Sequence, residues 1–151
     1  MRQFTLSLYE KFDRPIALLD NWHRVNAMID SGARFPVWVA EEELLLDLGA
    51  KLKMENVYFG GFGGSTQGRL YELPYFKLGD LVYPCLNIIA CPIDAPCEIV
   101  ISATMFAHLG CLIDYENHAL TVTIPDNQST VRNLVIEDKE GRLHVLCQSS
   151  E

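Results

Sequence analysis

The sequence predicts a mainly β protein, folded as a closed barrel or a sandwich, with one or two short helices in a single domain. Apolar and polar residues alternate over several short segments, which is the period of a half-buried strand. Turn residues separate these segments at close intervals, and only two stretches resemble a helix. The chain has 151 residues, enough for one domain with its own core.

The first half of the chain contains most of the clear strand patterns. Residues 4–9 read Phe-Thr-Leu-Ser-Leu-Tyr, a regular alternation. A helix is expected over residues 40–48, because three glutamates suit the positive end of a helix dipole and Gly49 is a suitable stop. The strands expected in this half are residues 4–9, 16–19, 23–29, 54–59 and 70–78.

The second half is expected to hold further strands and one short helix. Ser102 has the character of a helix N-cap for residues 104–109, and Gly110 would close that helix. The strands expected here are residues 82–89, 99–101, 111–113 and 119–124, followed by a hairpin of 133–137 with 143–147.

Composition narrows the possible partners. The net charge is −8, and no cluster of Lys and Arg is present to bind nucleic acid. No apolar run is long enough for a signal peptide or a membrane span, so a cytoplasmic location without a membrane partner is expected. The five cysteines, an odd number, are expected to be reduced thiols. No metal or cofactor is expected, because the adjacent residues Glu41–Glu43 would not converge on one ion.

The segment with the strongest chemical character is Asp30-Ser31-Gly32-Ala33. An apolar strand runs directly into an acid, a hydroxyl, a glycine and a small residue. The glycine lets the backbone turn tightly beside the carboxylate, and the serine can hold the loop by hydrogen bonding. The alternative is an ordinary strand-to-turn segment, since these residues are common in turns.

This segment resembles the active-site loop of retropepsin-like aspartic peptidases, which reads Asp-Thr/Ser-Gly-Ala. The resemblance implies a retropepsin-like closed acid-protease barrel, with Asp30 catalytic and Ser31, Gly32 and Ala33 supporting the loop. It extends over a core of about residues 4–124 and leaves a C-terminal hairpin extension, 125–151, beyond it. The matching pieces are an N-terminal hairpin at 4–19, the strand and loop at 25–33, a helix at 40–48, a flap at 58–75, and a strand and helix at 99–109.

The resemblance has one departure close to the proposed site. The family has two apolar residues followed by glycine before its second helix. Here the run is Ile99-Val100-Ile101-Ser102-Ala103, so Ser102 or Ala103 stands where glycine is expected.

The mechanism implied by the family needs two carboxylates. Two close aspartates share a proton, so one acts as general base on a water and the other as general acid toward the peptide carbonyl. The chain has one Asp-Ser-Gly, which implies a homodimer that joins two copies of Asp30. Asp114 is an alternative second acid, but its segment resembles a hairpin turn and no glycine follows it.

A glycine-rich run at residues 60–68 is the candidate flap over a bound peptide. Its flap residues are expected to be Gly60, Gly61, Phe62, Gly63 and Gly64. A phosphate-binding loop would need a Gly-Lys-Ser/Thr ending and a following helix, which are absent here. A merely flexible loop stays open as an alternative.

Aspartic endopeptidase activity on a peptide or protein substrate is therefore the leading hypothesis. The competing hypothesis is a catalytically inactive retropepsin-fold module for peptide binding or dimerisation. An unrelated β-barrel with a coincidental Asp-Ser-Gly, and a Cys–His nucleophilic pair formed in space, are further alternatives.

Overall fold

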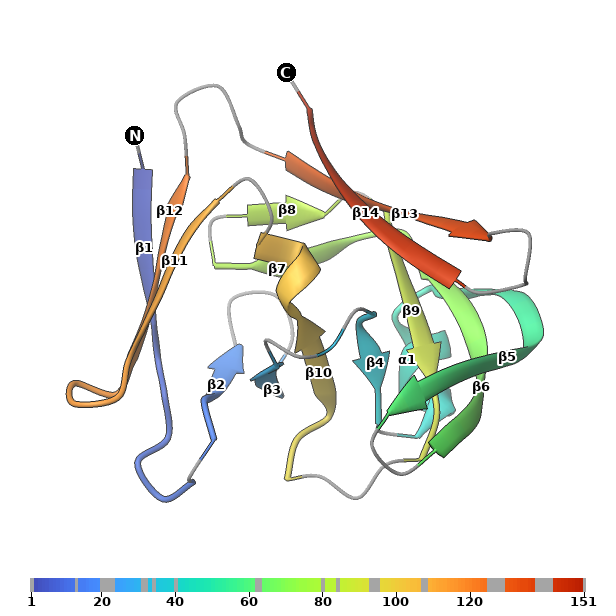
Figure 1. The fold of residues 1–151 in the computed structure, drawn as a ribbon, viewed down its shortest axis with the longest axis horizontal. Helices are drawn as coiled ribbons and strands as arrows, with labels where there is room; N and C mark the ends of the chain where they lie inside the picture. Colours follow the sequence, from blue (N-terminus) through green and yellow to red (C-terminus); the bar gives the residue numbers. More distant parts are fainter. Residues whose placement is uncertain are drawn as a thin grey trace.

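The protein is described from a computed structural model. The residues that the structure describes are 2–12, 14–19, 24–30, 33, 35–39, 41–61, 64–79, 81–83, 85–92, 96–106, 109–124, 130–137 and 143–150. Their strands pair in three sheets of seven, four and three strands (Figure 1). The mainly β prediction is confirmed, but the described strands form three open sheets and do not close into one barrel.

The seven-stranded sheet, here called the central sheet, forms the middle of the molecule. Strand β10 lies parallel to β3 on one side and antiparallel to β4 on the other, and β4 is parallel to β9. The hairpin of β5 and β6 forms the far edge. The spatial order is β2 (Ile16–Leu19), β3 (Val25–Asp30), β10 (Ile99–Ser102), β4 (Val37–Trp38), β9 (Leu86–Ala90), β6 (Gly64–Leu73) and β5 (Lys51–Gly61).

Hydrophobic clusters cover both faces of the central sheet. Neighbouring residues of a strand point to opposite faces. Ile99 belongs to one cluster and its neighbour Val100 to the other. Ile88 and Ile89 likewise belong to different clusters. Burial on both faces explains why the central strands are continuous apolar runs instead of alternating ones.

The three-stranded sheet corrects the expected N-terminal hairpin. Strand β1 (Arg2–Ser7) pairs with β12 (Ala119–Ile124), which also pairs with β11 (Gly110–Asp114). An isolated antiparallel bridge between Leu8 and Ala17, with the Tyr9 N–H donating to the Ile16 carbonyl at 2.9 Å, joins the first segment to β2. Residues 4–9 and 16–19 are therefore extended, as expected, but they belong to different sheets.

The four-stranded sheet contains the C-terminal hairpin. Its order is β14 (Leu143–Ser150), β13 (Thr130–Glu137), β8 (Leu81–Tyr83) and β7 (Phe76–Leu78). The expected hairpin of 133–137 with 143–147 is confirmed and is longer at both outer ends. The single strand expected over 70–78 is wrong: it divides into β6 and β7, because Pro74 offers no backbone N–H to a ladder. The strand expected over 82–89 likewise divides into β8 and β9.

The helices are shorter than the sequence suggested. Helix α1 covers Glu42–Asp47, and Gly49 follows it with a φ of 88°, the left-handed stop that its glycine allows. The second helix is a 3-10 turn, η1, over Ala103–Phe106. Ser102 ends strand β10 and directly precedes η1, which is the position of an N-cap, so that expected role stays a prediction. None of the described helices is long and apolar enough to cross a membrane.

Candidate active site

Asp30 is the last residue of a buried central strand. Four of the six residues of β3 are buried, and Asp30 is half-buried at the point where the strand ends. Strand β10 runs parallel beside it, with Ser102 as the register partner of Asp30. The carboxylate is thus carried by a backbone that has neighbours on both sides, β2 and β10.

The loop after Asp30 turns back immediately. The backbone N–H of Ala33 donates a hydrogen bond to the Asp30 carbonyl at 3.3 Å. Ser31 and Gly32, expected to support the loop, lie outside the described residues. The described ends of the loop, Asp30 and Ala33, are consistent with the tight turn that the glycine predicts.

Ser102 contacts this loop through its side chain. Its hydroxyl Oγ donates a hydrogen bond to the Ala33 carbonyl at 2.8 Å, across 69 positions of sequence. The side chain of Ser102 is completely buried, with a relative exposure of 0%. The residue that departs from the family pattern is therefore in contact with the candidate active-site loop.

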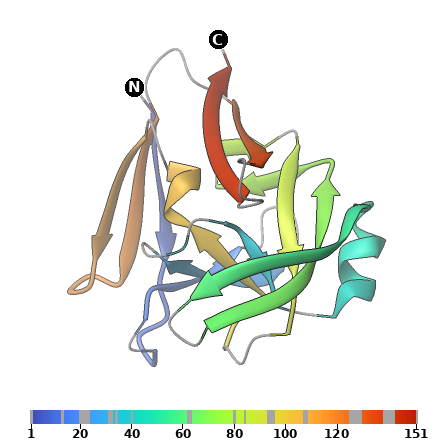
Figure 2. The same cartoon turned by 45° about the vertical axis from the view of Figure 1, so that its right-hand side comes forward.

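The expected flap residues fall in a long β-hairpin. Gly60 pairs with Ser65 and Gly61 with Gly64, so the ladder of β5 and β6 extends to the connection at Phe62 and Gly63. Those two residues lie outside the described part of the chain. The free end of the hairpin points away from α1, toward the side of the molecule with β10 and β3 (Figures 1 and 2).

A close backbone approach holds the root of this hairpin. A Cβ added at Gly68 would lie 2.7 Å from the Ala90 carbonyl oxygen and 2.7 Å from the Ile89 Cγ2. Such a contact is too short for any side chain, so glycine lets β6 pack directly on β9. Gly68, the last glycine of the run, thus has a packing role, while Tyr58 nearer the free end is 67% exposed.

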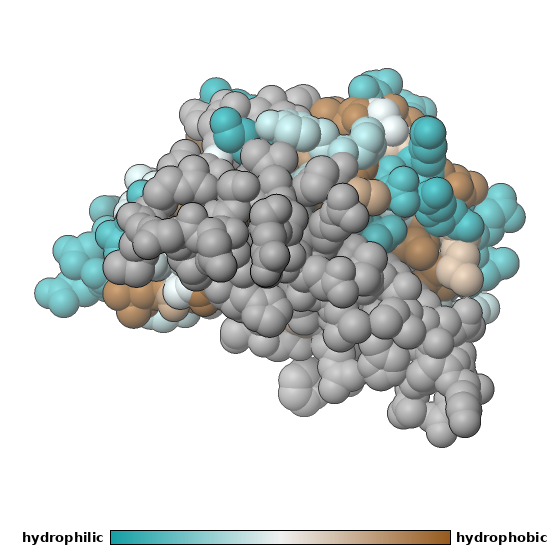
Figure 3. Space-filling view, turned by 90° about the horizontal axis from the view of Figure 1, so that it is seen from above, coloured by the Kyte–Doolittle hydropathy of each residue, from teal (hydrophilic) through white to brown (hydrophobic). Residues whose placement is uncertain are grey.

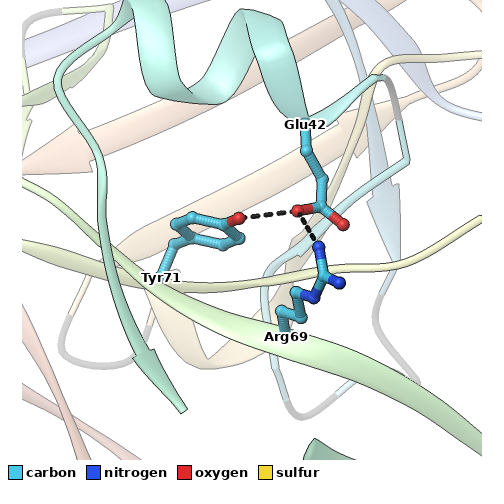
Figure 4. Close-up of polar contacts among 3 residues, drawn as sticks. All are labelled: Glu42, Arg69 and Tyr71. Atoms are coloured by element: carbon cyan, nitrogen blue, oxygen red, sulfur yellow. Dashed lines mark hydrogen bonds and ion pairs between the residues drawn. The ribbon is translucent and has the colours of Figure 1, made fainter. Parts of the chain in front are cut away.

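A polar cluster that the sequence did not reveal joins the hairpin to α1. The Tyr71 hydroxyl donates a hydrogen bond to Glu42 Oε2 at 2.6 Å, and Arg69 NH1 donates to the same oxygen at 3.0 Å (Figure 4). The Tyr71 hydrogen bond, with Arg69 beside it, holds the pKa of Glu42 below its usual range. The same bond raises the pKa of Tyr71. Glu42, Arg69 and Tyr71 are here called the hairpin latch.

The Asp114 carboxylate is hydrogen-bonded within a turn, as expected from the hairpin pattern of its segment. Its Oδ1 accepts the Asn117 backbone N–H at 3.0 Å, and its Oδ2 accepts the Asn117 side-chain amide at 2.7 Å. These bonds lower the pKa of Asp114. The carboxylate is thus committed to closing the turn between β11 and β12.

Three of the cysteines, Cys91, Cys97 and Cys111, have little thiolate character. Burial raises the pKa of Cys91 to about 11, and it also raises the pKa of Cys97 and Cys111. The thiolate is the nucleophilic form, so these residues are poor candidates for a Cys–His pair. Within the described residues, no group of three or more His, Cys, Asp or Glu could hold a metal ion.

Comparison with solved structures identifies the fold. The chain is similar to the crystal structure of a retropepsin-like aspartic protease from Rickettsia conorii, with a TM-score of 0.55. The superposition covers 80% of this chain and 89% of that chain, at 16% sequence identity. No protein-family model matches the sequence, and no curated protein matches it. The chain therefore has a retropepsin-like fold, as the Asp30 segment led us to expect.

Proposed function

We propose that the protein is an aspartic endopeptidase that acts as a homodimer, with Asp30 of each copy at the shared site. The observation that carries the proposal is the position of Asp30. It ends a buried strand of a retropepsin-like fold, beside a parallel partner strand and at the start of a tight loop. A carboxylate at this position is attached to a backbone that paired strands hold in place. General acid–base catalysis requires such a fixed position of the acid.

The reaction would use both copies of Asp30. One carboxylate takes a proton from a water, which attacks the peptide carbonyl carbon. The other, protonated, gives its proton to the carbonyl oxygen. The C–N bond of the tetrahedral intermediate then breaks as the first carboxyl group gives the proton taken from water to the amine nitrogen, and a hydroxyl of the intermediate returns a proton to the second carboxylate. An extended peptide would lie under the β5–β6 hairpin and pair with its backbone groups.

The exposed edge strand β11 is our candidate for the surface that binds the second copy. In the described part of the chain, β11 pairs only with β12, which leaves its other edge open. Its segment Gly110-Cys111-Leu112-Ile113-Asp114 carries one charge, and Leu112 is 63% exposed. Hydrophobic side chains reach the surface at the end of the molecule formed by β1, β11 and β12 (Figure 3). Two such strands could pair antiparallel about a two-fold axis.

The edge strand β5 has features that discourage such pairing. It carries Lys51, Lys53 and Glu55, and its register shifts between Leu52 and Val57. Charges and bulges are the usual protection of an edge strand. Strand β11 has neither over its first four residues, and only η1 and a short segment separate it from Ser102 beside Asp30. A second copy bound to β11 would therefore contact a strand that follows the proposed site by only a few residues in the sequence.

The primary test replaces the proposed catalytic acid. Asp30→Asn keeps the size of the side chain but removes the ionisable group, so peptidase activity should fall by about a thousandfold or more, since the residues of a catalytic unit fail together. Asp47→Asn, at the exposed end of α1, is the matched control and should retain activity. Both variants should unfold at the wild-type denaturant concentration. Full activity of Asp30→Asn would overturn the proposal, and a wild-type protein that is strictly monomeric and binds no pepstatin-type inhibitor would favour the inactive module.

A second test addresses the dimer. Leu112→Lys adds a charge to the open edge and should convert the dimer to an inactive monomer, as measured by light scattering and peptide cleavage. Leu46→Lys is the control, because Leu46 on α1 is exposed to a similar degree, 51%. A Leu112→Lys protein that remains dimeric would exclude β11 as the interface.

A further inference from the structure

The chain has a buried hydroxyl at Ser102, one of the two residues that stand where the retropepsin-like pattern has glycine. Ser102 is the only polar side chain, aromatic residues aside, that is fully buried among the residues whose burial the structure describes. A buried hydroxyl costs free energy unless it is hydrogen-bonded. Ser102 meets this requirement with the bond of 2.8 Å to the Ala33 carbonyl.

This bond completes the attachment of the loop. On its amide side, Ala33 is tied back to the Asp30 carbonyl at 3.3 Å. On its carbonyl side, it is tied to Ser102 on the neighbouring strand. Because Ser102 is also the register partner of Asp30, the strand that fixes the start of the loop and the side chain that fixes its end belong to the same element, β10.

We propose that Ser102 is a positioning residue that holds the Asp30 loop in its reactive geometry, a role that rests on the proposed peptidase function. A glycine at residue 102 has no side chain and could not reach the Ala33 carbonyl. The chain therefore holds its loop with a side chain, and the change from glycine to serine is compatible with catalysis. Ser102 acts through the loop and takes no part in proton transfer.

The kinetic test compares three substitutions at this position. Ser102→Ala and Ser102→Gly remove the hydroxyl, so kcat should fall by about tenfold to a hundredfold, the loss expected when a catalytic group is misplaced by about 1 Å. KM should change less than twofold, because the β5–β6 hairpin proposed to cover the peptide is not altered. Ser102→Thr keeps a hydroxyl on a residue that suits a strand, and it should restore most of kcat.

The control variant separates positioning from general loss of stability. Ile101→Val removes one methyl group from the fully buried residue that precedes Ser102 and leaves the hydroxyl in place. It should lower the melting temperature, while kcat stays within twofold of wild type. An equal loss of kcat in Ile101→Val and Ser102→Ala, at equal melting temperatures, would reduce Ser102 to a structural residue and overturn the proposal.

A structural measurement decides the role of Ser102 even if the wild-type protein cleaves nothing. Hydrogen exchange of the backbone amides in residues 30–35 is measured for wild type, Ser102→Ala and Ile101→Val. Exchange should rise at least tenfold in Ser102→Ala only. Unchanged exchange in Ser102→Ala would overturn the positioning role, whereas an inactive wild type with the expected exchange pattern would overturn only the peptidase function.

Discussion

The strands beneath Asp30 and the hairpin proposed to cover it differ in how they are held. All four residues of β10 are buried, and the strand is paired on both sides. In contrast, the first six residues of β5 are exposed, and this strand is paired on one side only. The hairpin is held at its root by the ladder of β6 with β9, by the close approach at Gly68 and by the hairpin latch.

This difference suits the chemistry proposed for the two regions. A catalytic carboxylate must be held within a fraction of an ångström of its working position, which favours a core strand. A cover must open for an extended peptide and close over it, which favours an element with few buried contacts. If the comparison is sound, substitutions should cost most stability in β10, less at the root of the hairpin and least in the latch.

The largest effect is expected in the middle of β10. Ile99 is fully buried and pairs with Ala27 on one side and Trp38 on the other. Ile99→Ala should lower the free energy of unfolding by about 2–5 kcal/mol, because it leaves a cavity between strands that cannot collapse easily. Urea denaturation would measure this loss. A smaller loss of unfolding free energy than in the hairpin variants would contradict the claim that β10 is held more firmly than the hairpin.

The sequence predicted much of this arrangement and missed its long-range part. The regular alternation of residues 4–9 and the glycine at residue 49 were sufficient to place a strand and a helix end. The partner of the first strand was missed, because alternation shows which residues are extended and says nothing about which strand lies beside them.

In the candidate site, too, the sequence predicted the local motif but not the long-range contacts. The motif at Asp30 could be found from four adjacent residues. The contacts from Ser102 to Ala33 and from Tyr71 to Glu42 could not, since they span 69 and 29 positions. Ser102 before a short helical segment has the local signature of an N-cap. What the local signature could not show is that Ser102 also pairs with Asp30 and donates its hydroxyl to the Ala33 carbonyl.

A smaller effect is expected at the root of the hairpin. Gly68→Ala would place a methyl group 2.7 Å from a backbone oxygen of β9, so the two strands must separate. We expect a loss of about 1–3 kcal/mol, the usual cost of an inserted methyl group in a close-packed site. The hairpin would also be displaced, so KM for peptides should rise.

The matched control for this substitution is Gly110→Ala on β11. There the added Cβ would lie 3.1 Å from the Thr123 Cβ, a longer contact than the 2.7 Å at Gly68. Its effect on the free energy of unfolding should stay within about 0.5 kcal/mol, as for most exposed positions. Equal losses at the two glycines would show that Gly68 has no special packing role.

The smallest effect, and the only one that should depend on pH, is expected at the hairpin latch. Tyr71→Phe removes the bond to Glu42 and should lower the free energy of unfolding by about 0.5–1 kcal/mol near pH 7, since the Glu42 side chain is 35% exposed and water screens the contact. The lowered pKa of Glu42 means that the contribution is complete above the usual carboxyl pKa and is lost as pH falls through the lowered value. The raised pKa of Tyr71 means that the contribution is complete below the usual tyrosine pKa and is lost as pH rises through the raised value.

Wild type and Tyr71→Phe should therefore differ most between about pH 5 and pH 9 and converge outside that range, as urea denaturation across a pH series would show. Lys53→Gln is the control on the same hairpin. The Lys53 Nζ lies 3.6 Å from the Glu72 carboxylate, and both side chains are partly exposed, so this variant should stay within about 0.5 kcal/mol of wild type. If Tyr71→Phe lost as much stability as Ile99→Ala, the hairpin would be held as firmly as the strands under Asp30. The closing motion proposed for it would then have to come from another part of the chain.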